Sequence, residues 1–226
     1  MFRIQHLILY TAAIKPMHDF YVQVFGKDIV QLQSSGFTIQ FGTSRLEFKE
    51  VTNGTKPFYH FAINIAANHL EQAKAWIAKT TPLSTEEGQD DTHSEFFNSY
   101  SCYFEDPAGN IVECIARQQH APTDLNDFTP ASIQSIGEIN ITTPSVLATA
   151  NLLHKANMPI QLELIDEQRL NFVGSMDAYL LLGPVGRRWF FSHQLSEIHP
   201  LTIQFDHSLQ LDLDDEGKLE CTYLPS

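Results

Sequence analysis

The chain has few cysteines, few basic residues and no long apolar run. Three cysteines are an odd number, and no CxxC pair occurs among them, so neither a disulfide framework nor a thiolate zinc site is indicated. Lys and Arg total 14 against 27 Asp and Glu, for a net charge of −13, which argues against a nucleic-acid partner.

Two kinds of membrane or export segment are also missing. No uninterrupted stretch approaches the ~20 apolar residues of a membrane span, and residues 1–6 do not begin a basic region followed by an apolar one, as a signal peptide would. We therefore expect a cytoplasmic protein with reduced thiols and no membrane partner.

The composition is that of a folded protein with a large core. Hydrophobic residues make up 43% of the 226 residues, and 16 of them are Phe. At roughly 150 residues per domain, this length allows one large domain or two modest ones.

A repeated order of elements organises the first half of the chain. Alternation over residues 2–11 predicts a strand, helical spacing over 16–25 predicts a helix that ends at Gly26, and three short strands follow before residue 52. The same strand-helix-strand-strand-strand order starts again at Phe58 and ends at Arg117. The two units span roughly 1–55 and 56–118.

The second half is interpreted as a degenerate continuation of this pattern. Residues 119–132 form a linker, and 133–226 contain a third βαβββ unit, with a last strand expected at 188–192, followed by a truncated fourth unit. Each unit alone exposes an apolar sheet face, so units must pair. We expect an α+β fold in which the tandem modules of 1–118 pair into curved mixed sheets around a cavity.

Strand parity assigns chemistry to the open face of the paired units. Alternate residues of a strand lie on one side of it, and the apolar ones belong against the helix. The open face then receives two imidazoles and two carboxylates, from His6, Glu47, His60 and Glu113. This group suits a divalent metal ion such as Zn, Ni, Fe, Mn or Co.

The internal repeat supports this four-residue metal site. His6 and His60 hold the same place in the first strand of successive units, and Glu47 and Glu113 both lie in the last strand of a unit. A random set of His and Glu residues would not be paired by the repeat in this way.

Other polar residues on the open face are candidates for substrate contacts. Arg45 and Lys49 flank Glu47 and suit an anionic group, although a solvated strand face with ordinary ion pairs is the alternative. Asn64 and Gln40 are expected to line the same pocket.

The third unit is expected to lack a second metal set. Glu138 stands where His6 does, and Asn140 and Thr142 continue that face. We interpret the C-terminal half as a scaffold, a lid or a dimerisation surface.

Two stretches carry a family resemblance. Residues 59–65 (YHFAINI) and 106–113 (DPAGNIVE), within tandem βαβββ units, resemble the vicinal oxygen chelate superfamily. Its members include glyoxalase I, extradiol ring-cleaving dioxygenases, fosfomycin-resistance transferases and metal-free proteins of bleomycin resistance. The resemblance is good over 2–118 and rests on topology alone over 133–226.

The resemblance to glyoxalase I implies a metal-dependent lyase or isomerase. The family's metal ligands fall on His6, Glu47, His60 and Glu113, and the open positions would bind two adjacent oxygens of a small oxygenated substrate and stabilise an enediolate. Glu47 or Glu113 would then carry a proton as general base.

Two other functions stay open. An Fe(II) extradiol dioxygenase would use His6, His60 and Glu113, with Tyr103 positioning substrate and His93 assisting. A metal-free protein that binds a small molecule is the third hypothesis. The family forms its site within one chain or across a homodimer, and the sequence favours neither.

Overall fold

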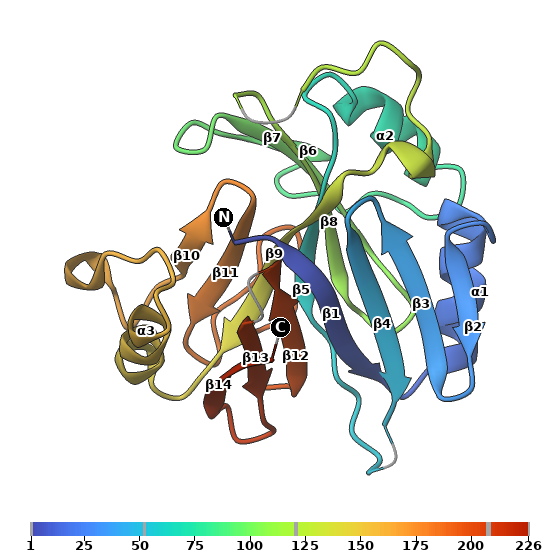
Figure 1. Ribbon diagram of the computed structural model, residues 1–226. Coiled ribbons are helices and arrows are strands. Elements are labelled where there is room, and N and C mark those ends of the chain that lie inside the picture. The colour runs from blue at the N-terminus through green and yellow to red at the C-terminus, as the bar shows by residue number, and fades with distance from the viewer. Residues whose placement is uncertain (1, 52, 120–121, 207–208, 226) are drawn as a thin grey trace.

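The computed structural model describes residues 2–51, 53–119, 122–206 and 209–225 (Figure 1). The first unit contains β1 (Ile4–Thr11), α1 (Ile14–Phe25), β2 (Val30–Gln33), β3 (Gly36–Phe41) and β4 (Ser44–Glu50). The second unit contains β5 (His60–Asn64), α2 (Leu70–Ile77), β6 (Asp91–Ser94), β7 (Ser99–Glu105) and β8 (Ile111–Arg117). Both follow the predicted βαβββ order.

The second half begins with the short helix η1 (Pro130–Ser132). The third unit contains β9 (Ser135–Thr142), α3 (Val146–Lys155), the short helix η2 (Leu162–Leu164), β10 (Asn171–Ser175) and β11 (Ala178–Gly183). The chain then adds β12 (Leu201–Phe205), β13 (Leu209–Leu213) and β14 (Leu219–Tyr223). The strand expected at 188–192 is wrong, because these residues form turns with one isolated bridge from Arg188 to Leu195.

The strands form two mixed seven-stranded sheets. Sheet A has the order β14-β13-β12-β1-β4-β3-β2, and sheet B has the order β10-β11-β9-β5-β8-β7-β6. Figure 1 shows the C-terminal strands, in dark red, beside the blue β1. The predicted fold class, an α+β arrangement of βαβββ modules in curved mixed sheets, is confirmed.

The partners of the units differ from the expectation. The first two units do not share a sheet: the first pairs with the C-terminal strands through β1 and β12, and the second pairs with the third through β5 and β9. Each sheet therefore includes strands from both sides of the expected linker, of which residues 120–121 lie outside the described residues. The alternation of a strand fixes its faces but leaves the choice of partner to tertiary packing.

One apolar core joins the inner faces of both sheets. Leu7 and Leu46 of sheet A and Phe61 and Val112 of sheet B are fully buried in the same cluster, together with side chains of α1, α2 and α3. The residues that alternate with them must point away from this core. The two sheets consequently present separate polar faces.

Sheet B is curved strongly enough to bring its two edges together. Phe97 lies in the hairpin between β6 and β7 at one edge, and Phe172 lies in β10 at the other edge. Their ring centroids are nevertheless 4.7 Å apart. The face of sheet B that points away from the core is therefore enclosed.

In the described part of the chain, no helix is both long enough and apolar enough to cross a membrane. Its α-helices are short and pack against the sheets.

The turn of residues 106–110 ties the helix of the first unit to the first strand of the second. The buried carboxyl of Asp106 accepts hydrogen bonds from the Tyr21 hydroxyl (2.7 Å), the Asn110 side chain (2.8 Å) and the backbone N–H of Ala108 (3.0 Å). Asn110 in turn accepts a bond of 2.7 Å from the backbone N–H of Tyr59. The turn thereby fixes the start of β5.

Replacing Asp106 with Ala should destabilise the protein, because the Tyr21 hydroxyl and the Asn110 amide would stay buried without an acceptor. We expect a loss of about 2–3 kcal/mol in the free energy of unfolding, measured by urea denaturation. Asp28→Ala, on an exposed turn, should change it by less than about 0.5 kcal/mol. Equal losses in the two variants would contradict this role for the turn.

Candidate metal centre

The small side chain of Ala62 lies between two carboxylates on sheet B. Ala62 in β5 is in register with Glu113 of β8 on one side and with Glu138 of β9 on the other. Residues directly opposite each other share a face of the sheet, so both carboxylates point to the enclosed side. Since Ala62 projects only a methyl group, the space between the carboxylates stays open.

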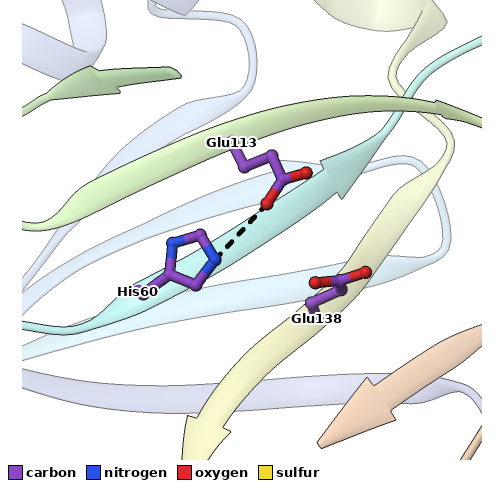
Figure 2. Close-up of side chains that lie close together, drawn as sticks. All are labelled: His60, Glu113 and Glu138. Carbon is purple, nitrogen blue, oxygen red and sulfur yellow. Dashed lines mark ion pairs between the residues drawn. The ribbon is translucent and has the colours of Figure 1, made fainter. Parts of the chain in front are cut away.

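His60 completes the group from two residues earlier on β5. Its Nε2 lies 3.3 Å from Oε2 of Glu113, as Figure 2 shows. Its Nδ1 lies 3.1 Å from the backbone carbonyl of Ile111, and because a carbonyl only accepts, Nδ1 carries the hydrogen. The other ring nitrogen, Nε2, therefore faces the carboxylates and is the atom of His60 that could bind a metal ion.

The three side chains form a compact and buried group with the composition of a metal site. One ligand atom from each of His60, Glu113 and Glu138 lies within 4.8 Å of the others. Their exposed fractions are 6%, 4% and 4%. All three residues come from one chain, so this group needs no second copy of the protein.

Arg117 holds Glu138 in place. Its Nη2 contacts Oε1 of Glu138 and its Nη1 donates to Oδ1 of Asn64, each at 2.5 Å. Asn64 also donates to Ser135 on β9. Gly137 leaves room for this network, because a Cβ there would lie 2.3 Å from the Asn64 oxygen.

The two carboxylates of the group differ in acidity. Burial and the charge of Glu113 raise the pKa of Glu138 to about 8, although Arg117 opposes both effects. Burial also raises the pKa of Glu113, but bonding to His60 and Ser101 and the charge of Arg117 outweigh it, so that pKa lies below its usual range. At neutral pH Glu138 is therefore largely protonated beside the ionised Glu113, and a cation bound between the two would favour the ionised form of Glu138.

A cavity of about 350 Å³ opens over this group. Its floor holds His60, Glu113 and Glu138, and one wall carries small polar side chains from β6 and β7. Aromatic rings dominate the remaining walls: Phe97, Tyr103, Phe172, Trp189 and Phe190. Such a shape suits a small planar molecule.

The segment 184–196, which the sequence led us to expect as a strand in part, covers this cavity. Trp189 places its ring 5.0 Å from the His60 ring, and Phe191 stacks on Tyr103 at 4.5 Å. Arg187 lies 4.4 Å above the Trp189 ring. The indole ring thus lies over the floor of the cavity, and the ring of Phe191 packs behind Tyr103.

Polar contacts anchor this covering segment to sheet B and to the loop between α2 and β6. Arg188 pairs with Glu86 (3.0 Å), Ser192 donates to Glu105 (2.7 Å) and Gln194 donates to the carbonyl of Gly109. The cover is thus anchored at several points along its length.

His6 and Glu47 form a separate pair on sheet A. His6 Nε2 lies 2.8 Å from Oε2 of Glu47, and Arg45 lies 3.2 Å from His6 Nδ1. Burial and the charge of Arg45 lower the pKa of His6. The four residues expected as one metal site thus lie on two different sheets, because β1 and β5 do not pair.

The registers of the two sheets explain this outcome. Ile8 in β1 is flanked by Glu47 of β4 and Thr202 of β12, as Ala62 is flanked by Glu113 and Glu138. His6 and Glu47 of sheet A thus correspond to His60 and Glu113 of sheet B. In sheet A, however, Thr202 stands in place of Glu138, and the bulky Ile8 stands in place of Ala62. Among the described residues, only sheet B brings three such ligand atoms within 4.8 Å of one another.

The expected pocket residues are also dispersed. Lys49 lies 3.7 Å from Glu47 on sheet A, and Gln40 donates to the carbonyls of Gly42 and Ser44 there. Asn64 lies on sheet B but binds Arg117 and lines a different cavity from the one over His60. Tyr103, by contrast, does line the cavity beside Glu113.

The metal site expected from the sequence does not include Glu138. The repeat aligns Glu138 with His6, and its carboxylate completes a group on another unit's strand. A signal for Glu138 exists in the repeat, because Glu138 holds the place in the third unit that His60 holds in the second. When β9 pairs with β5, residues at these equivalent places lie on the same face of the sheet.

The third unit matches a known family. The family described as toxoflavin-degrading enzyme matches residues 136–187, which include Glu138 and Arg187 but less than half of the chain. Among curated proteins, none matches this chain.

Solved structures resemble the whole chain or parts of it. A candidate dioxygenase from Bacillus subtilis has a TM-score of 0.59 and 15% identity, over 99% of this chain and 86% of that one. Lactoylglutathione lyase from Agrobacterium tumefaciens has a TM-score of 0.39 and 23% identity, over 50% and 91%. A glyoxalase I variant from Zea mays has a TM-score of 0.48 and 15% identity, over 80% and 66%. The chain has the fold of the vicinal oxygen chelate superfamily.

Proposed function

We propose that the protein is a divalent-metal-dependent enzyme that degrades a small planar substrate carrying two neighbouring oxygen or nitrogen donors. The observation that supports this most directly is the set of His60, Glu113 and Glu138, whose ligand atoms lie within 4.8 Å of one another at the floor of an aromatic cavity.

The donor set fits a metal ion of intermediate hardness. One imidazole with two carboxylates suits Mn²⁺, Fe²⁺ or Co²⁺ better than thiolate-preferring ions, and three ligands leave open positions in an octahedron. The ring of His60 is oriented by its bond to the Ile111 carbonyl and Glu138 by Arg117, as outer partners orient ligands in metalloproteins. A bound ion would act as a Lewis acid toward two adjacent substrate donors.

Residues around the ligands supply binding and proton handling. Tyr103 places its hydroxyl beside Glu113, and burial together with the neighbouring carboxylates raises its pKa well above the usual value, so it stays a donor that can position a substrate oxygen. Trp189 and Phe191 cover the site and exclude water from it.

The cavity favours degradation of a planar ring over the lyase or isomerase reaction that the resemblance to glyoxalase I implied. Neither ligand set inferred from the sequence stays whole, because Glu47 of the isomerase set and His6 of both sets lie on sheet A, so the choice rests on the shape of the cavity. The aromatic walls agree with the names of two matches, a toxoflavin-degrading enzyme over 136–187 and a candidate dioxygenase. Isomerisation with Glu113 as the base is the second candidate.

Metal content tests the proposal. We expect wild-type protein, loaded with Mn²⁺, Fe²⁺ or Co²⁺ and desalted, to retain about one equivalent by plasma mass spectrometry, and His60→Ala to retain almost none. His6→Ala is the matched control, because His6 holds the equivalent place on sheet A, and it should retain the metal. Loss of metal in both variants would favour the four-residue site, and no retention by wild type would favour a metal-free binding protein.

Ala62 provides a test of the geometry that leaves every ligand in place. Ala62→Val inserts two methyl groups between the carboxylates, so we expect metal affinity to fall at least tenfold in a competition titration with a chelator. Ala62→Gly, which adds no bulk, should bind metal within about threefold of wild type. Both variants are checked for retained fold by thermal unfolding, and equal affinities in the two would contradict the proposed site.

A further inference from the structure

A second cavity of about 590 Å³ adjoins the one over the candidate metal centre. The two cavities share three lining residues, Phe97, Leu170 and Phe172. The edges of sheet B meet at the contact between Phe97 and Phe172, so these two rings separate the two cavities. We call the second cavity, which lies between these rings and the segment 159–165 with its short helix η2, the annex.

The annex lacks the charged lining residues of the cavity over His60, Glu113 and Glu138, which we call the metal cavity. The residues that line it include no Asp, Glu, Lys or Arg, whereas the metal cavity holds Glu113, Glu138 and Arg187. A molecule that fills both would carry its polar donors at one end and an uncharged end in the annex.

Two polar side chains of the annex are already engaged by the protein. Asn171 donates to the carbonyls of Asp166 and Arg169 and accepts from the N–H of Asp166. The Tyr179 hydroxyl donates to the sulfur of Met176. These groups have little left to offer a ligand, which leaves the exposed Gln161 as the remaining polar side chain of the lining, so the annex selects mainly by apolar contact.

Large apolar side chains gather at the annex and are exposed to solvent. Phe96 is 87% exposed, Leu164 69% and Phe172 41%. Clustered exposed apolar side chains around a concave surface mark a binding site more often than scattered ones do.

We infer that the substrate of the metal centre has an uncharged apolar substituent, an alkyl chain or an aryl ring, that extends from its metal-binding end past Phe172 into the annex. This inference rests on the proposed function, because it takes the metal cavity as the place of the polar end. Because the contact between Phe97 and Phe172 separates the two cavities, a ligand that spans both would part these two rings, one of which, Phe172, is 41% exposed.

Linear hydroxamic acids test the inference, since the hydroxamate binds a metal through two neighbouring oxygens while the chain length varies. We expect calorimetric titration of the Mn²⁺-loaded protein to show acetohydroxamate binding weakly, and affinity to rise by up to about fourfold for each methylene that is buried. Octanohydroxamate should bind at least about 100-fold more tightly than acetohydroxamate.

Two matched variants locate the chain. Leu164→Asp, in the annex, should weaken octanohydroxamate at least about tenfold and leave acetohydroxamate unchanged. Leu32→Asp replaces a leucine of similar exposure, 67%, on sheet A and should change neither.

The outcomes separate the two proposals. If acetohydroxamate binds but chain length has no effect, or if Leu164→Asp and Leu32→Asp behave alike, the annex is not a substrate site and the metal centre stands. If neither hydroxamate binds the metal-loaded protein, the proposed metal function fails, and the inference that depends on it is overturned as well.

Discussion

The chemistry of this protein depends on which strand pairs with the free edge of β5. β9 pairs there in antiparallel register and sets Glu138 opposite Ala62, while β8 on the other side sets Glu113 opposite the same residue. A shift of one residue would turn Glu138 to the core, where an unpaired carboxylate is strongly unfavourable. Arg117 and the close approach at Gly137 hold the register that keeps the carboxylate in the cavity.

The two sheets are variations on one plan. In each sheet, the residue two positions after a histidine has an oxygen-bearing side chain opposite it on both neighbouring strands. Sheet B has Ala62 and Glu138 where sheet A has Ile8 and Thr202. A metal ion needs both a third donor and room to bind. Sheet B offers both, whereas sheet A offers only a polar face with the ion pair of His6 and Glu47.

The enclosure of the site comes from curvature and from an irregular segment. Contact between Phe97 and Phe172 brings the edges of sheet B together, and the segment 184–196 lays Trp189 and Phe191 over His60 and Tyr103. A buried site strengthens the interaction of each ligand with a cation, since fewer waters screen the charges. The same curvature joins the metal cavity to the annex through shared side chains.

The sequence by itself determined the local elements and their faces. Alternation and helix signals predict the βαβββ order, the α+β class and the position of His60 and Glu113 on the face opposite the apolar core, because these depend on residues close together in the chain. The turn 106–110 was recognisable for the same reason, since Asp106 bonds to its own neighbours Ala108 and Asn110.

Tertiary structure decided the partners. The repeat made His6, Glu47, His60 and Glu113 look like one set, and only the strand order shows that they are equivalent pairs on two sheets. Glu138 lies beside His60 and Glu113 because β9 crosses to β5 from beyond residue 118, and the segment 188–192 covers the cavity and does not form a strand. The reason is physical: strand pairing depends on backbone hydrogen bonds that any sequence can make, so the core packing of the whole chain selects the neighbour.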